Sequence, residues 1–138
     1  MAKGTKGIAV AGTLIADTFY KIDTYPDEGN LTNIRDIVSY IGETGNMLLD
    51  LAKMDPSVPL KVSGLIGDDT QGRMMKGELL KYPNIDISNL TVEGLSSVTH
   101  VMNAQDTKQR TFFYQGGASD IYDESYIDWE KLDADIFH

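Results

Sequence analysis

The sequence predicts a layered α/β fold that carries a small additional sheet. Short apolar runs that end at glycine alternate with two segments whose apolar residues follow helical spacing, which is typical of this fold class. Two strand-rich excursions, at about 18–41 and 98–117, interrupt the alternation. A chain of 138 residues has the length of one ordinary domain. We therefore expect residues 1–138 to form one core with one appendage, rather than two successive domains.

The first core strand and the first excursion follow from local composition. Residues 8–11 are a short apolar run ended by Gly12, which predicts a buried strand. Residues 18–22 are rich in β-formers, and a turn over 26–30 connects them to a second strand over 34–41. Neither face of this second strand is purely polar. The hairpin is therefore expected to be contacted on both sides, by a ligand or by a partner.

The next stretch predicts the helices of the core. Residues 42–46 break the strand and open a helix over 47–54, in which apolar residues recur at helical spacing. A strand over 61–66 follows. Either Asp68 or Asp69 then caps a second helix, because aspartate is a favoured N-cap residue. Capping explains this acidic pair better than a metal site does.

The C-terminal third predicts a second hairpin and the start of a further core element. Strands over 98–103 and 110–115 flank a polar stretch and form the hairpin. The two hairpins together are expected to build one small lid sheet. Residues 126–132 are expected to form a short helix with Trp129 as a packing anchor. Residues 134–138 resemble the beginning of another core strand.

The composition excludes several classes of protein. The 12 Lys and Arg residues against 21 Asp and Glu give a net charge of −9, without a basic cluster, which argues against nucleic acid as a partner. No cysteine is present, which excludes disulfides, a thiolate zinc site and a cysteine nucleophile. Two histidines are too few for a His-rich metal site. The apolar stretch over 8–16 is too short to cross a bilayer, so we expect a cytoplasmic protein with no membrane partner.

Four sequence features, in order along nearly the whole chain, resemble the N-terminal half of the ribokinase-like (PfkB-family) carbohydrate kinases. Each feature is weak alone, and their order is what makes the resemblance specific. They are a strand ended by Gly12 with Asp17 after it, Gly42-Glu43-Thr44-Gly45-Asn46 before an apolar helix, Val62-Ser63-Gly64-Leu65-Ile66-Gly67-Asp68-Asp69 with Gly72, and Thr99 with Arg110-Thr111-Phe112-Phe113-Tyr114 and Gly117-Ala118. The resemblance implies part of a three-layer α/β/α core with a small β-sheet lid.

The resemblance also implies which residues bind a substrate. The parent enzyme would transfer phosphate from ATP to a sugar hydroxyl, with Asp17, Gly42 and Asn46 at the sugar. Asp17 follows the first strand, where open α/β sheets hold their ligands. Asp17 could equally be a solvated turn residue, and Asn46 an N-cap or first-turn residue. Phe112 and Tyr114 share a strand face that either closes over the sugar or packs within the lid.

The sequence departs from the family pattern in two respects. Ile41 stands where the family usually has the first glycine of a pair, and a β-branched residue there disfavours positive φ and crowds an approaching ligand. The glycine-rich segment that ends in the catalytic aspartate is absent. We therefore expect no catalytic residue in this chain and no kinase activity from it alone. ATP and Mg²⁺ are expected as cofactors of the full-length enzyme, and neither is expected to bind this chain by itself.

Other functions stay open at this point. One alternative is a non-catalytic sugar-binding or dimerisation module, because unpaired edges of lid strands favour pairing with a second copy. The same edges predict a homodimer of the kinase through its lid sheet. A nucleoside kinase of the same superfamily is another alternative, whereas a dinucleotide-binding oxidoreductase is disfavoured because no G-x-G-x-x-G turn follows the first strand. A sheet cut after one half leaves apolar surface uncovered, so the isolated chain is expected to oligomerise or aggregate.

Overall fold

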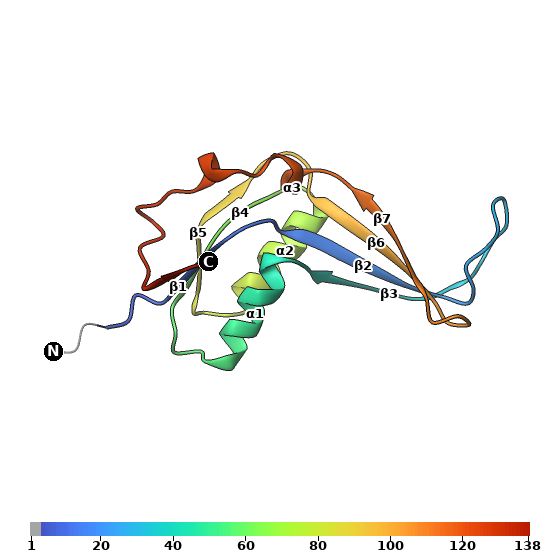
Figure 1. Cartoon of the computed structure of the whole chain (residues 1–138), viewed down its shortest axis with the longest axis horizontal. Helices are drawn as coiled ribbons and strands as arrows, with labels where there is room; N and C mark the ends of the chain where they lie inside the picture. The colour runs from blue at the N-terminus through green and yellow to red at the C-terminus, as the bar shows by residue number, and fades with distance from the viewer. Residues whose placement is uncertain (1–3) are drawn as a thin grey trace.

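A computed structural model describes residues 4–138, which form two four-stranded sheets and two helices of 11 residues each (Figure 1). The elements follow the chain as β1 (Ile8–Ala11), β2 (Ile15–Ile22), β3 (Ile34–Ile41), α1 (Thr44–Met54), β4 (Leu60–Ile66), α2 (Thr70–Leu80), β5 (Ile85–Val92), β6 (Ser97–Ala104), β7 (Arg110–Gln115), the short α3 (Ala118–Ile121), a 3-10 helix (Glu124–Tyr126) and β8 (Ile136–Phe137). The predicted α/β class is confirmed.

The core sheet has the strand order β5-β4-β1-β8, and its strands are parallel. Helices α1 and α2 lie beside each other against one face of this sheet (Figure 1). The buried apolar side chains between them include Val10, Leu14, Leu48, Ala52, Val62, Met75 and Leu79. Within residues 4–138, the opposite face is crossed by α3, the 3-10 helix and the irregular chain that leads to β8. One helical layer of the expected three-layer core is thus formed by α1 and α2. The second helical layer is absent from the described residues, and only short segments cover that face of the sheet.

The lid sheet has the strand order β3-β2-β6-β7 and projects from one end of the core (Figure 1). β2 pairs antiparallel with β3, and β6 pairs antiparallel with β7, so each excursion is a hairpin. β2 and β6 pair in parallel from Ile15↔Ser97 to Ile22↔Ala104, which joins the two hairpins. The prediction of a single lid sheet is confirmed. β2 begins earlier than expected, so Asp17 lies inside the strand and is not a turn residue.

Asp69, one of the two predicted candidates, is the N-cap of α2. Its carboxylate accepts hydrogen bonds of 2.7 Å from the Gly72 amide, the Ser96 amide and the Ser96 hydroxyl. The Ser96 hydroxyl in turn accepts a 3.0 Å bond from the Gly67 amide. One carboxylate therefore fastens the start of α2 to the loop that leads into the lid strand β6. Asp68 is exposed.

Ile41 does not obstruct the space beside Gly42. It ends β3, is 1% exposed, and packs into the core on the strand face opposite Tyr40. Its side chain fills the space beside Gly45, where an added Cβ would lie 2.2 Å from Ile41 Cγ1. The expectation that Ile41 crowds a ligand is therefore wrong. The positive φ of this turn, 53°, is at Glu43 instead.

The predicted helix over 126–132 is wrong. Helical structure stops at Tyr126, and Asn89 exchanges hydrogen bonds with both the amide and the carbonyl of Asp128. Residues 129–132 form only a turn, in which the amides of Lys131 and Leu132 donate to the Asp128 carbonyl. Trp129 is 58% exposed, with its ring centroid 5.0 Å from that of Phe137, so it is not a buried anchor. β8 does pair with β1, as a core strand would, but it is short and exposed at the sheet edge.

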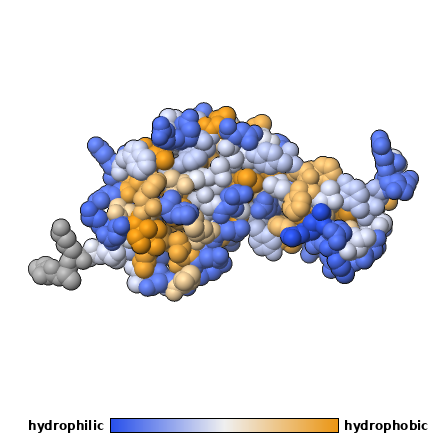
Figure 2. All heavy atoms as spheres, in the orientation of Figure 1, coloured by the Kyte–Doolittle hydropathy of each residue, from blue (hydrophilic) through white to orange (hydrophobic). Residues whose placement is uncertain are grey.

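Large apolar side chains reach the surface on both parts of the molecule (Figure 2). Those on the core include Ile121 of α3 and, near β8, Trp129, Ile136 and Phe137. Those on the lid include Tyr25, Ile34, Ile37, Phe112 and Phe113. Within residues 4–138, the helices are all too short or too polar to traverse a bilayer.

Candidate functional site

Asp17 lies where β2 passes from the core into the lid. It pairs with Tyr40 of β3 on one side and with Thr99 of β6 on the other. Its strand neighbours Ala16 and Thr18 are buried on the opposite face of the sheet, so the half-buried Asp17 carboxylate projects away from α1 and α2. We call the face that carries Asp17 the inner face of the lid.

Gly42 touches the Asp17 carboxylate directly. A Cβ added to Gly42 would lie 2.3 Å from Asp17 Oδ2 and 3.0 Å from Cγ, so only glycine leaves room for this carboxylate. The Gly42 amide donates a 2.7 Å hydrogen bond to the Ile15 carbonyl, which fixes the β3–α1 turn against the start of β2. Two predicted site residues from separate segments therefore converge.

The surroundings of Asp17 are unfavourable for its charge. Burial raises the pKa of the Asp17 carboxyl, hydrogen bonding by the Thr99 hydroxyl partly offsets this, and the Glu43 carboxylate raises the pKa further. A carboxylate held in this way gains from O–H donors that replace lost water. Vicinal hydroxyls of a polyol are donors of that kind, because one carboxylate can accept from two of them.

Asn46 lies close to Gly42 in the chain, but it lines a groove that includes neither Asp17 nor Gly42. The N-cap of α1 is Glu43, so Asn46 is the third residue of the helix and not its cap. Its side chain is exposed beside the outer edge of β3, in a groove that also includes Tyr40, Lys53 and Glu78. The structure brings Asp17 and Gly42 into contact, and it places Asn46 one helical turn beyond them.

Phe112 and Tyr114 lie on the inner face of the lid. In the strand register, Thr99 of β6 pairs with Asp17 on one side and with Tyr114 on the other. Phe112 pairs with Val101, two residues further along the same face. Both aromatic rings are about half exposed. The predicted sharing of one face is correct, and it is the face of Asp17. A role in sugar contact stays a prediction.

Three residues that the sequence did not single out as site residues belong to this region. Thr99 lies between Asp17 and Tyr114, and Glu43 follows Gly42 with its side chain exposed. Asp120 accepts a 2.7 Å hydrogen bond from the Tyr114 hydroxyl. Strand alternation could have identified Thr99, but the position of Asp120 depends on α3, which was not predicted.

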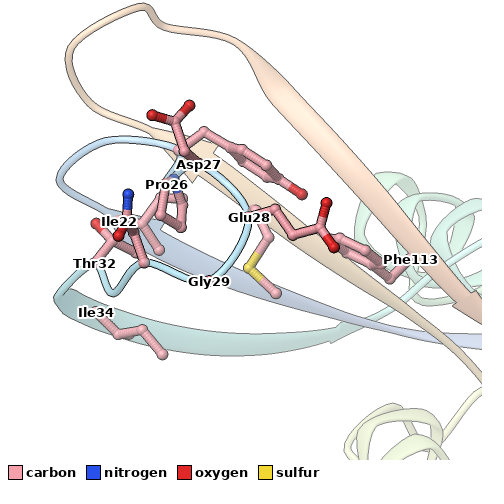
Figure 3. Close-up of a pocket in the computed structure, with 11 residues that line it drawn as sticks. Ile22, Pro26, Asp27, Glu28, Gly29, Thr32, Ile34 and Phe113 are labelled. Carbon is pink, nitrogen blue, oxygen red and sulfur yellow. The ribbon is translucent and has the colours of Figure 1, made fainter.

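A mostly apolar hollow of about 520 Å³ lies on the outer face of the lid, away from Asp17. The loop after β2 folds over it, and Ile22, Ile34, Met102 and Phe113 of the strands line it (Figure 3). Asp27 and Glu28 of the loop stand at its rim (Figure 3). Within residues 4–138, no three His, Asp or Glu side chains are grouped as metal ligands.

The two-sheet arrangement is found in solved structures. The chain superposes on ribokinase from Thermotoga maritima with a TM-score of 0.81 at 19% identity, over 95% of this chain and 43% of that protein. The chain has a ribokinase-like fold. Ribokinase from Arabidopsis thaliana, solved with ribose and ATP, gives a TM-score of 0.72 at 22% identity over 83% of this chain and 37% of its own. A nucleoside kinase of the ribokinase family from Methanocaldococcus jannaschii gives 0.65 at 18% identity, over 84% and 39%.

The ribokinase-like chain thus spans less than half the length of these three proteins. Neither a protein-family model nor a curated protein sequence matches it. The sequence features that resemble ribokinase-like kinases and the arrangement of the two sheets agree on the fold.

Proposed function

We propose that this chain is the sugar-binding half of an ATP-dependent carbohydrate kinase of the PfkB family. The observation that carries the proposal is the contact between the Asp17 carboxylate and Gly42 on the inner face of the lid. Asp17 is thereby a partly desolvated acceptor, close after the carboxyl end of β1, where open α/β sheets bind ligands.

In this proposal each predicted site residue has one task. Asp17 accepts hydrogen bonds from two sugar hydroxyls, and Gly42 leaves room for the Asp17 carboxylate in the position that does so. Asn46 turns its amide toward the sugar from the first turn of α1. Phe112 and Tyr114 cover the sugar from the lid, where aromatic rings exclude water.

The remaining requirements of phosphoryl transfer lie outside this half. Transfer depends on positioning and on neutralising charge by phosphate-binding amides, a metal ion and an aligned base. We propose that ATP and Mg²⁺ bind to the other half of the parent enzyme. The 138-residue chain, mixed with ATP and a sugar panel, is then expected to give no sugar phosphate, and turnover that rises with the concentration of this protein would contradict this.

The sugar site itself is tested by calorimetry with neutral sugars and nucleosides. Asp17→Asn is expected to weaken binding of the preferred sugar by about 10- to 100-fold, since a hydrogen bond to a charged group contributes about 1.5–3 kcal/mol. Asp36→Asn is the matched control, because Asp36 is an exposed carboxylate on the same face near the far end of the lid. Equal affinities of wild type and Asp17→Asn would refute the site, and a nucleoside as the tightest ligand would favour a nucleoside kinase.

A dimerisation module is the second candidate, favoured by the outer face of the lid. Phe113 and Ile34 are about half exposed there, beside the apolar hollow of Figure 3. Exposed apolar side chains of this kind mark protein contacts. We propose that a second copy of the lid covers this face, in the kinase and in the module alike.

A further inference from the structure

We propose that Asp120 is a positioning residue that holds Tyr114 of the lid over the proposed sugar site. The inference rests on the proposed function, because it assigns Asp120 a task at the same site. It also assigns the Tyr114 hydroxyl a fixed direction, with its proton given to Asp120 and its oxygen left to accept from the ligand.

Tyr114 is well placed to face a ligand bound at Asp17. Their strands are separated by β6 alone, so the two backbones lie about 10 Å apart at the usual strand spacing of about 4.8 Å. Thr99 is the residue between them, and its side chain is small. A ring-sized ligand above Thr99 would therefore meet Asp17 on one side and Tyr114 on the other.

Hydrogen bonds fix the Tyr114 hydroxyl. It donates to Asp120 Oδ1 at 2.7 Å and lies 3.3 Å from Ser97 Oγ. Ser97 Oγ accepts a 3.0 Å bond from the Ser119 amide, and the Ser119 hydroxyl donates to the Leu14 carbonyl at 3.2 Å. The network connects the lid strand β7 to α3 and to the chain that enters β2.

The Asp120 carboxylate is itself held in place. A Cβ on Gly116 would lie 2.1 Å from Asp120 Oδ2, so the carboxylate rests directly on the Gly116 backbone. The Asp120 amide donates a 3.0 Å bond to the Gly117 carbonyl in the turn that opens α3. A glycine at 116 and a carboxylate at 120 are thus fitted to each other at the point where the lid returns to the core.

The surroundings of Tyr114 raise the pKa of its phenol. Hydrogen bonding with Ser97 lowers the pKa of Tyr114, but the hydrogen bond to Asp120, burial and the Asp120 charge together raise it. An ionised carboxylate has no proton to donate, so the direction of the Tyr114–Asp120 bond is fixed. The Tyr114 oxygen then presents only lone pairs to a sugar hydroxyl.

The experiment is a double-mutant cycle on the 138-residue chain. The affinity of the sugar preferred by the wild type is measured by calorimetry for Tyr114→Phe, Asp120→Ala and the double variant. We expect each single variant to bind about five-fold more weakly, the size of one hydrogen bond, and the double variant to bind no more weakly than either. Asp120→Asn, which keeps an acceptor oxygen, is expected to stay within about two-fold of wild type.

A matched control separates positioning from support of the fold. Asp123→Ala removes a carboxylate from the same segment, where Asp123 accepts bonds from the amide and hydroxyl of Ser125 at the 3-10 helix. It is expected to leave sugar affinity unchanged. Wild-type affinity in Asp120→Ala, or effects of the two single variants that simply add, would overturn the proposal.

A second measurement does not depend on sugar or on the folding of Asp120→Ala. The ionisation of Tyr114 is obtained from alkaline absorbance titrations as the difference between wild type and Tyr114→Phe. Asp120→Asn is expected to lower the pKa of Tyr114, because it removes the charge that helps to raise it. An unchanged titration would refute the Asp120–Tyr114 contact even if sugar binds, whereas a shifted titration without sugar binding by wild type would refute the proposed function.

Discussion

Replacement of Gly42 by alanine is the sharpest test of the candidate site. The φ of Gly42 is not in the left-handed region, so alanine costs little in backbone conformation. The added Cβ would instead collide with Asp17 Oδ2, at a separation of 2.3 Å. Because the half-buried Asp17 side chain can rotate, we expect the carboxylate to move and the backbone to stay.

The expected losses of stability and of sugar affinity depend on how the Asp17 carboxylate moves. Overpacking costs about 1–3 kcal/mol where neighbours are rigid, so a movable carboxylate places the loss of stability near the lower end, at about 1 kcal/mol. Loss of a charged hydrogen bond to the sugar costs about 1.5–3 kcal/mol, which corresponds to a loss of affinity of about 10- to 100-fold. Gly42→Ala should therefore impair binding much more than folding.

Two other glycines provide matched controls for calorimetry and urea denaturation. Alanine at Gly45 would press on the buried Ile41, so it should lower stability by about 1–3 kcal/mol through the core. Gly77, inside α2, has open space around it, and alanine there should raise stability by about 0.5–1 kcal/mol. If Gly42→Ala binds sugar like wild type, the Asp17–Gly42 contact does not form the site.

Three further predictions concern pH, capping and assembly. Burial and the Glu43 charge raise the pKa of Asp17 above its ordinary 3.8, so the folded state favours the protonated carboxyl. The stabilisation of the fold by this protonation is therefore fully present below pH 3.8 and is lost as the pH rises through the raised pKa. Asp17→Asn should therefore melt above wild type at pH 7 and converge with it in acid, and a lower melting temperature at pH 7 would contradict this. Burial would raise the pKa of Asp69, but bonds from Ser96 and Gly72 outweigh it and lower the pKa, so its stabilisation is present above pH 3.8 and is lost as the pH falls through the lowered value. Asp69→Ala should lose about 2 kcal/mol in urea denaturation at pH 7, with the deficit shrinking in acid; an undiminished deficit would show that the cap is not the cause. In sedimentation, Phe113→Asp should dissociate lid-mediated oligomers while Phe112→Asp, on the inner face, leaves them intact, and the reverse order would place the contact on the inner face.

The sheets were predictable because their signals are local. Residues 8–11 are an apolar run closed by glycine, and the strands 34–41 and 110–115 keep the bounds that composition gives them. The acidic pair before α2 predicts a cap by either Asp68 or Asp69, and the structure selects Asp69, which accepts from the Gly72 amide. In each case the residues that decide the structure are neighbours in sequence.

The wrong predictions concern segments whose structure is determined by residues distant in the sequence. Nothing within residues 126–132 reveals that Asn89, which is distant in sequence, bonds both the amide and the carbonyl of Asp128. The position of Ile41 looked obstructive because the face of β3 was unknown, whereas pairing with Ala16 of β2 turns it into the core. Side-chain direction along a strand is set by register, and register is a property of the whole sheet.

The candidate site, too, was predictable from local sequence only in part. The resemblance selected Asp17 and Gly42 from motifs about 25 residues apart, but only the packing of the β3–α1 turn on β2 makes them touch. Each of the four chain crossings between core and lid contributes to this region: β2 supplies Asp17, the β3–α1 turn supplies Gly42, β6 supplies Thr99, and β7 supplies Tyr114 with its partner on α3. A ligand held there would contact both sheets at once. Its binding energy would therefore fix the lid against the core, and hydrogen exchange of β6 and β7 should slow when sugar binds to wild type but not to Asp17→Asn.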